Sequence, residues 1–349
     1  MARRRRAGGR LRPVLASVAV LVVVGAIVLW ALIRGGGGEG NARVVVPRGA
    51  SFRVVSDSLA AKGVIRSAAL FRVYAKFSGR DRTIQPGTYQ IARGLPYGQI
   101  VDALASGRGI VHVITVVEGW ELRQIVPQLA RTLGVPVDSV TAAVRDTALL
   151  TRLGIPTETL EGYLFPATYT FPDGTTARQA VAKMVARFEA AWQPGWDVEL
   201  QRLALSRHDA VTLASIVERE ARRPEERPVI AAVYYNRLRK GMRLQADPTV
   251  QYALGRHVDR VLYKDLEIDS PYNTYRVSGL PPGPIAAPGA PSLEAAVKPA
   301  NVPYLFFVAE PDGHHEFRTT MAEHEAAVRV ARRMRDSVAR STGSAPARR

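Results

Sequence analysis

The residues best suited to chemistry lie in the segment 209–220, DAVTLASIVERE. Its apolar residues are spaced as in an amphipathic helix, which places the Glu218 carboxyl over the small residues Ala214 and Ser215. A carboxyl in such surroundings is poorly solvated, so we expect its pKa to rise until it can hold a proton near neutral pH. The pattern therefore predicts Glu218 as a general acid. The alternative is a surface glutamate paired with Arg222, four residues further on.

A second carboxylate is the next requirement of most enzymes that hydrolyse glycosidic bonds. Glu220 is the obvious candidate, but two residues on a helix correspond to a rotation of about 200°, so Glu218 and Glu220 point to nearly opposite sides. One acid suffices if the attacking group belongs to the sugar itself. The acid then protonates the leaving oxygen, and the resulting carboxylate takes a proton from the sugar's own hydroxyl. Such an enzyme is a lytic transglycosylase and not a hydrolase.

Two further segments gather polar residues suited to a sugar. The first contains Gln245 and Asp247, and the run Asp-Pro-Thr that starts at Asp247 is typical of a helix start with Asp247 as N-cap. Contact with substrate is the alternative role for Asp247. The second segment, residues 270–275, includes Asn273 and Tyr275, an amide and a phenol that can bind hydroxyl and acetamido groups or stack on sugar faces.

Two other chemistries are disfavoured by the sequence. A zinc site built on His314, His315 and His324 lacks a His-x-x-x-His helix, and adjacent histidines in a strand face opposite sides, so these residues are predicted to be surface histidines. Ser215 lacks the Gly-x-Ser-x-Gly turn of a hydrolase nucleophile, and mid-helix its hydroxyl is expected to bond back to a carbonyl. We therefore predict no metal and no cofactor.

The charge of the chain gathers at its ends. With 48 Lys+Arg against 31 Asp+Glu the formal net charge is +17, and much of the excess lies in residues 3–12 and 329–349. No aromatic-basic interleaving accompanies it, so nucleic acid is not the expected partner. The absence of cysteine excludes a disulfide framework and a thiolate site. With 47% hydrophobic residues, the rest of the chain is expected to fold.

A membrane anchor is predicted at residues 14–34. Residues 14–33 are uncharged, and about 20 helical residues span about 30 Å of hydrocarbon. The run has no small-x-small site behind it, which favours an uncleaved anchor over a signal peptide. Because arginines cluster before the run, the basic segment 1–13 is expected to stay cytoplasmic, and everything after the glycine-rich tether at 35–42 to be exported.

The exported part is predicted to hold two domains in an α+β fold. Residues 43–109 show a β-α-α-β order followed by a short helix, which resembles a LysM-type glycan-binding module; a structural spacer is the alternative. Residues 110–339 form a larger mixed α+β catalytic domain, and 340–349 a disordered tail. Its expected elements are a strand at 111–117, helices at 121–133, 176–192 and 321–339, an apolar loop at 280–291 and a hairpin at 304–317.

The sequence resembles the endolytic murein transglycosylases, the MltG or YceG-like family. The resemblance rests on motifs that occur in order across about 150 residues and whose combination is highly specific. They are EGYLFP at 161–166, LASIVERE at 213–220, NRL at 236–238, GMRLQADPTV at 241–250, YNTY at 272–275, GLPPGPI at 279–285, PG at 288–289 and PYLFFVA at 303–309. The module at 43–109 and the single anchor are also similar to that family.

The resemblance implies that Glu218 is the catalytic acid/base and that the substrate is nascent peptidoglycan. Such an enzyme cuts between N-acetylmuramic acid and N-acetylglucosamine and leaves a 1,6-anhydro-muramoyl end. Substrate positioning is then expected of Gln245, Asp247, Asn273, Tyr275, Glu161 and Tyr163. The expected location is the outer face of the bacterial inner membrane, with peptidoglycan synthases as further candidate partners. The rival reading is a non-catalytic, membrane-anchored scaffold that binds peptidoglycan.

Overall fold

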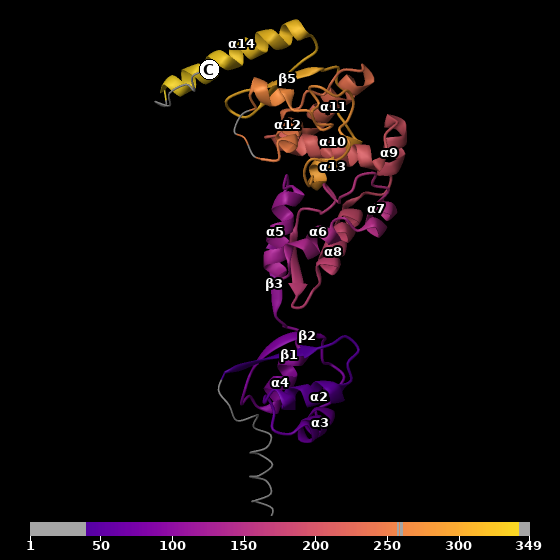
Figure 1. The fold of residues 1–349 in the computed structure, drawn as a ribbon, viewed down its shortest axis with the longest axis vertical. Coiled ribbons are helices and arrows are strands. Elements are labelled where there is room, and N and C mark those ends of the chain that lie inside the picture. The colour runs from indigo at the N-terminus through magenta and orange to yellow at the C-terminus, as the bar shows by residue number, and fades with distance from the viewer. Residues whose placement is uncertain (1–39, 257, 259–260, 342–349) are drawn as a thin grey trace, which may run out of the picture. The chain divides into compact units, whose positions relative to one another are not determined.

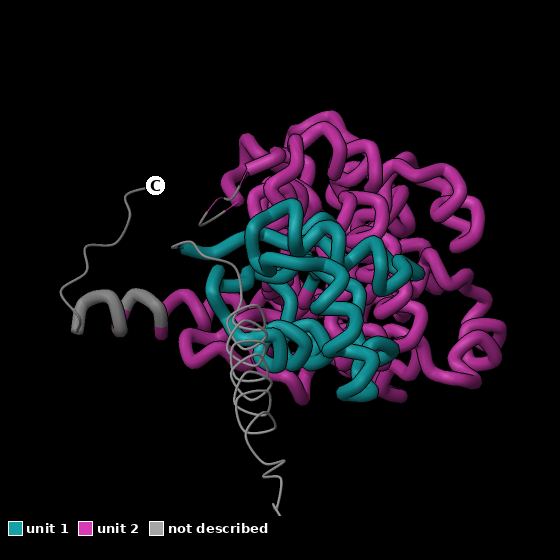
Figure 2. Tube along the Cα trace, turned by 90° about the horizontal axis from the view of Figure 1, so that it is seen from below, with its two compact units in different colours: residues 1–112, 171–174 teal, residues 113–170, 175–349 magenta. Residues whose placement is uncertain are grey.

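The computed structural model describes residues 40–256, 258 and 261–341, and it is a mixed α+β structure (Figure 1). The predicted cytoplasmic segment 1–13, the anchor at 14–34, most of the tether and residues 342–349 of the tail lie outside the described residues. No helix within the described ranges is long and apolar enough to cross a bilayer. The chain divides into two compact units (Figure 2). Unit 1 runs to His112 and includes Phe171–Gly174, and unit 2 holds Val113–Thr170 and the chain from Thr175 onward.

Unit 1 has the predicted β-α-α-β order. Its elements are β1 (Asn41–Val46), α2 (Phe52–Ala61), α3 (Ala68–Phe77), β2 (Gly87–Ala92) and α4 (Tyr97–Ala105). β1 and β2 pair antiparallel, from Asn41 opposite Ala92 to Val46 opposite Gly87. Both first helices start where a serine hydroxyl accepts a backbone N–H, Ser51 for α2 and Ser67 for α3. β1 ends before Pro47, which has no backbone N–H to donate to a strand ladder.

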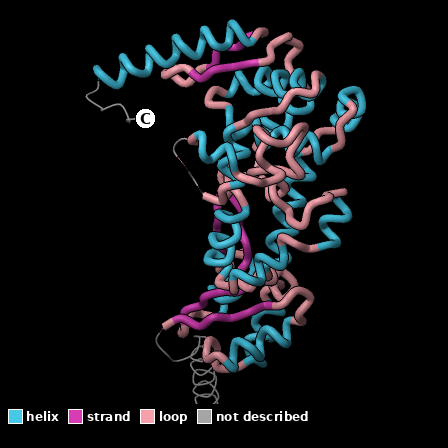
Figure 3. The backbone as a smooth tube through the Cα atoms, turned by 45° about the horizontal axis from the view of Figure 1, so that its top comes forward, coloured by secondary structure: helices cyan, strands magenta, loops and turns pink. Residues whose placement is uncertain are grey.

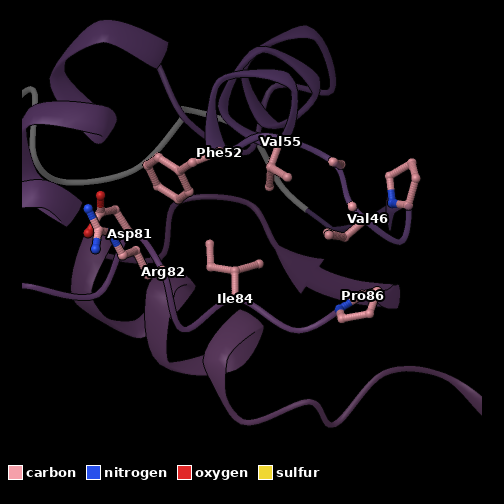
Figure 4. A pocket seen from close by; sticks show the side chains of 10 residues that line it. Val46, Phe52, Val55, Asp81, Arg82, Ile84 and Pro86 are labelled. Atoms are coloured by element: carbon pink, nitrogen blue, oxygen red, sulfur yellow. The ribbon is translucent and has the colours of Figure 1, made fainter.

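The core of unit 1 consists of aromatic rings together with the inward-facing residues of its two strands. Phe71 and Tyr97 are fully buried and meet edge to face, with ring centroids 5.2 Å apart. Beside this core lies a pocket of about 250 Å³ (Figure 4). Phe52 lies on one side of the pocket with Ile84 opposite, and Asp81 and Arg82 are the charged residues among its lining.

Unit 2 is mostly helical, as the cyan helices of Figure 3 show. Its helices are α5 (Leu122–Leu133), α6 (Val137–Ala143), α7 (Thr147–Leu153), α8 (Ala177–Ala191), α9 (Trp196–Leu203), α10 (Arg207–Glu220), α11 (Arg227–Arg239), α12 (Asp247–Ala253), α13 (Ala290–Val297) and α14 (Met321–Ser341), with 3-10 turns η1 (Pro224–Glu226) and η2 (Tyr263–Glu267). β3 (Val111–Thr115) pairs with β4 (Thr168–Pro172), and the boundary between the units falls within this pair. β5 (Phe306–Ala309) and β6 (His315–Arg318) form the predicted hairpin, which is antiparallel.

The helix α10 lies at the centre of unit 2. Its start is closed by a capping box between Ser206 and Asp209, and it packs against α11, α12 and α13 (Figure 1). Every residue from Ala210 to Val217 is buried, which is expected only of a helix enclosed on all sides. Glu218, Arg219 and Glu220 at its carboxyl end are the first residues after this buried run that are not fully enclosed.

The start of α12 differs from the prediction. Ala246 is its N-cap and Asp247 is already helical, with Pro248 next, so the predicted N-cap role of Asp247 is wrong. The reason is tertiary, because the hydroxyl of Tyr275 donates to Oδ1 of Asp247 at 2.6 Å and draws the carboxylate away from the helix N–H groups. The helix start is instead held by Thr249, whose hydroxyl donates to the Ala246 carbonyl at 2.7 Å.

Candidate active site

Glu218 is held on both oxygens by the protein. Arg227 donates to Oε1 at 3.2 Å, and the backbone N–H of Gly289 donates to Oε2 at 2.9 Å. Arg227 is itself fixed by Ser292, whose hydroxyl accepts from Nε at 3.0 Å. The Glu218 side chain is only 6% exposed. The partner expected from helix spacing, Arg222, lies beyond the end of α10, and Arg227 takes the ion pair instead.

A second acid stands beside Glu218. A Cβ on Gly289 would overlap the carboxylate of Glu118, so a larger residue at this position would require the Glu118 side chain to move. Burial and the neighbouring Glu218 raise the pKa of Glu118, and the guanidinium of Arg227 opposes them. Sequence reasoning missed Glu118 and Arg227 as members of one cluster. The available signal was the Glu-Gly-Trp turn at 118–120 that follows a strand.

Glu220 points to the other side of α10, into a pocket of about 400 Å³. Three residues predicted to position a sugar, Gln245, Asp247 and Tyr275, line the same pocket. Tyr234 on α11 donates its hydroxyl to Oε1 of Glu220 at 2.9 Å. The remaining lining residues are Arg237, Leu244, Phe307, Val308, Ala309, His315 and His324. The structure therefore gathers half of the predicted substrate-positioning residues around Glu220, while Glu218 is absent from this lining.

The surroundings of Glu220 suit acid/base chemistry near neutral pH. Burial raises its pKa to about 7, the hydroxyl of Tyr234 opposes that rise, and the charge of Asp247 adds to it. Arg237 and Arg222 draw the pKa down again. A carboxyl with this pKa is present in both protonation states at neutral pH, which a group that first gives and then takes a proton requires.

Two separate segments supply Gln245, Asp247 and Tyr275 to the lining of this pocket. Gln245 has a left-handed backbone with φ of 51°, a conformation that a residue with a side chain rarely adopts. Its N–H donates to the carbonyl of Thr274 at 3.1 Å, and the next N–H, of Ala246, donates to the Thr274 hydroxyl at 3.0 Å. These bonds hold the strained turn and bring Asp247 and Tyr275 together.

The other three predicted substrate residues bind the protein itself. Asn273 is fully buried, and its amide donates to two carbonyls of its own turn, Leu266 at 2.8 Å and Ile268 at 2.9 Å. Tyr163 is fully buried and bonds Nδ1 of His208 at 2.9 Å. Neither residue is in the pocket lining. Their role as substrate contacts stays a prediction, and what the structure shows is a structural role.

Glu161 holds the start of α5. Both of its oxygens accept the N–H of Leu122 at 3.1 Å, and the Tyr252 hydroxyl donates to Oε2 at 3.4 Å. Burial raises the pKa of Glu161 to about 8 against these hydrogen bonds, so the group is largely protonated at neutral pH. Its role as a substrate contact also stays a prediction.

The prediction of surface histidines is wrong for His315. His314, the residue before β6, contacts Asp312 and is partly exposed, whereas His315, the first residue of β6, is buried. The inward side is occupied by the Glu226 carboxylate, which buries His315 at the pocket wall. Within the ranges that the structure describes, no three His, Asp or Glu residues are grouped so that they could hold a metal ion.

Comparison with known proteins places the chain in a family. The model of the YceG-like family matches residues 44–330, so the chain belongs to that family. It is similar to the endolytic murein transglycosylase of Bacillus subtilis (strain 168), with 39% identity over 297 residues that cover 81% of this chain and 82% of the relative. It is also similar to the endolytic murein transglycosylase of Streptococcus pneumoniae serotype 2, with 27% identity over 81% of this chain.

The chain spans only 57% of that pneumococcal relative. Among solved structures, it is similar to a YceG-like protein from Listeria monocytogenes, known at 2.6 Å. The two share 35% identity with a TM-score of 0.57, over 83% of this chain and all of that one. The mixed α+β fold predicted from sequence is confirmed by this likeness.

Proposed function

We propose that the protein is an endolytic lytic transglycosylase that cuts the β-1,4 bond between N-acetylmuramic acid and N-acetylglucosamine in peptidoglycan strands. The observation that carries the proposal is the pocket of about 400 Å³ in which Glu220, with a pKa of about 7, faces Gln245, Asp247 and Tyr275. An acid in both protonation states beside amide, carboxylate and phenol groups suits a polar sugar. Membership of the YceG-like family supports the same reaction.

In this mechanism one carboxyl carries the proton in both directions. Protonated Glu220 gives its proton to the oxygen that bridges the two sugars, and the C1–O bond of the muramoyl residue breaks. The C6 hydroxyl of the same residue attacks C1, and the Glu220 carboxylate takes the proton that this hydroxyl loses. The hydrogen bond from Tyr234 stabilises the carboxylate between the two steps. No water is consumed, and the product is a 1,6-anhydro ring that ends the strand.

The catalytic role of Glu218 remains a prediction from the sequence. The geometry of the pocket favours Glu220 in that role. Both Glu218 oxygens are engaged by protein groups, Oε1 by Arg227 and Oε2 by the Gly289 N–H, and Glu218 is not among the lining residues of the pocket. The two residues therefore form a matched pair for an experiment. Glu218→Gln and Glu220→Gln change the same functional group, two positions apart on one helix.

The test measures anhydro-ended fragments by mass spectrometry after incubation with uncrosslinked glycan strands. We expect Glu220→Gln to lower the rate about 100-fold or more and Glu218→Gln to keep most of the activity per folded molecule. The opposite result would return the catalytic role to Glu218. Parent-like product from both variants would remove the enzymatic assignment from this helix. The remaining hypothesis would then be the non-catalytic scaffold that binds peptidoglycan.

For unit 1 we propose a LysM-like module that holds glycan, within the domain limits 43–109. Supporting this are the β-α-α-β order and the pocket of about 250 Å³, where Phe52 offers an aromatic face and Asp81 and Arg82 offer polar groups (Figure 4). The test uses the full chain with Glu220→Gln, so that strands are not cut. Arg82→Ala should weaken strand binding several-fold, and unchanged binding would favour a spacer.

Anchoring in the inner membrane, with a cytoplasmic N-terminus and residues 110–339 as the exported catalytic domain, is likewise a proposal. It is supported by the uncharged run 14–33 behind an arginine cluster. Peptidoglycan synthases are partners that such a location would bring within reach. Extraction of membranes with alkaline carbonate, together with protease digestion of spheroplasts, tests the location. Release of the protein into the carbonate extract would contradict the anchor. Resistance of the catalytic domain to protease added outside the spheroplasts would contradict its export.

A further inference from the structure

His315, which lines the pocket that contains Glu220, is paired with a carboxylate behind it, that of Glu226. His315 is on β6, its side chain is only 3% exposed, and it is among the lining residues of the pocket. Glu226, at the end of η1, accepts the backbone N–H of His315 on Oε1 at 2.8 Å. Its other oxygen, Oε2, lies 2.7 Å from Nδ1 of the same ring. One buried carboxylate thus fixes both the backbone and the ring of His315.

This arrangement determines which ring nitrogen faces a ligand. An anionic carboxylate at Oε2 requires a proton on Nδ1, so in the neutral imidazole Nε2 is a lone-pair acceptor. Phe307 meets the ring edge to face, with centroids 5.2 Å apart, and keeps it from turning. Among the hydrogen bonds of the described residues none engages Nε2, nor is that atom one of the buried polar atoms left without a partner.

We infer that His315 is a substrate-binding residue, which accepts a hydrogen bond from an O–H or acetamido N–H of the sugar bound beside Glu220. Glu226 is the positioning residue that, in the neutral ring, holds the proton on Nδ1 and so leaves Nε2 as the acceptor. The inference rests on the proposed function, because it takes the occupant of the pocket to be an N-acetylated glycan. It adds a binding contact on β6 to the contacts expected from Gln245, Asp247 and Tyr275.

The experiment measures the Kd of uncrosslinked glycan strands by calorimetry, in full-length protein that carries Glu220→Gln. His315→Asn is the informative variant, because its amide N–H can replace Nδ1 toward Glu226 while nothing replaces Nε2. We expect Kd to increase about five- to tenfold, as for one lost hydrogen bond, with an unchanged melting temperature. The matched control is His314→Asn, at the partly exposed residue just before β6, which should leave Kd within about twofold.

Two further measurements separate binding from a structural role. With Glu220 restored, His315→Asn should raise KM by the same factor and leave kcat within about twofold. Glu226→Gln presents an amide N–H to Nδ1, which moves the ring proton to Nε2 and turns the acceptor into a donor, so its Kd should rise as well. If de-N-acetylated strands abolish the difference between parent and His315→Asn, the acetamido N–H is the donor. If the difference in Kd persists with these strands, a sugar hydroxyl is the donor.

Equal Kd values for His315→Asn and its parent would overturn the inference, as would an equal loss in His314→Asn. If the parent with Glu220→Gln fails to bind glycan at all, the proposed function fails, and the inference fails with it. The two failures are therefore distinguishable, since only the first leaves strand binding intact.

Discussion

The hydroxyl of Tyr234 donates a hydrogen bond of 2.9 Å to Oε1 of Glu220, across the contact between α11 and α10. Tyr234 is almost completely buried, so this bond forms away from water and favours the charged form of the acid. Burial of Glu220 acts in the opposite direction. The pKa of about 7 is the balance of the two effects together with the surrounding charges.

Replacing Tyr234 should shift that balance in a known direction. Tyr234→Phe removes the hydrogen bond that lowers the pKa of Glu220, so the pKa should rise above about 7. Because the protonated acid starts the reaction, kcat/KM falls as pH rises through this pKa, and the fall should move to higher pH in the variant. The pH profile of anhydro-end formation measures it. Tyr235→Phe, whose hydroxyl donates to the Ala296 carbonyl, is the control and should leave the profile in place.

Stability should also depend on pH through Glu161. Its folded-state pKa of about 8 lies above the ordinary value of 4.5, so between them the folded protein keeps a proton that the unfolded chain releases. This contribution is fully present below about pH 4.5 and is lost as pH rises through about 8, by up to about 1.4 kcal/mol per pH unit. Urea unfolding between about pH 5 and about pH 8 should show a smaller decline for Glu161→Gln than for the parent. Parallel declines would contradict the prediction.

Gly162 should not tolerate a side chain. Its φ is +82°, and a Cβ there would overlap Cβ of Pro284 and lie 2.7 Å from Cγ of the same ring. We expect Gly162→Ala to lower the free energy of unfolding by about 2–4 kcal/mol, from backbone strain and overpacking together. Gly154→Ala is the matched control, because its φ is +63° but nothing lies within 4 Å. It should cost only about 1–2 kcal/mol in the same denaturant titration. Equal losses of unfolding free energy in the two variants would show that Pro284 moves to make room for the added methyl group.

Removal of two buried hydroxyls on α10 should have different effects on the free energy of unfolding. Ser215 donates to the Thr212 carbonyl at 2.7 Å, as predicted for a mid-helix serine, and accepts the N–H of Ile285 at 3.0 Å. Ser215→Ala leaves that buried N–H without an acceptor and should cost about 1–3 kcal/mol of unfolding free energy. The Thr212 hydroxyl has no hydrogen-bond partner among the residues that the structure describes, so Thr212→Val should be neutral or stabilising. A stable Ser215→Ala variant would mean that another group, or water, satisfies Ile285.

Much of the local structure was predictable because its causes are local. The periodicity of 209–220 predicts α10, the alternation and turn residues of 304–317 predict the β5–β6 hairpin, and the element order of unit 1 follows from short-range patterns. The rotation between Glu218 and Glu220 was predictable for the same reason, since it depends only on helix geometry. Both glutamates could thus be placed on opposite sides before any tertiary contact was known.

Local patterns in the sequence are therefore enough to predict the helix, the divergence of its two acids and, through ordered motifs, the YceG-like family. Which of the two acids meets a pocket depends on long-range packing, because the pocket walls come from α11, the 245–275 loops and the β5–β6 hairpin, up to about 100 residues away from Glu220. The same long-range packing turned His315 inward to Glu226 and Asp247 toward Tyr275. Helix periodicity records which side chains share a face, whereas the solvent or partner that each face meets depends on the rest of the fold.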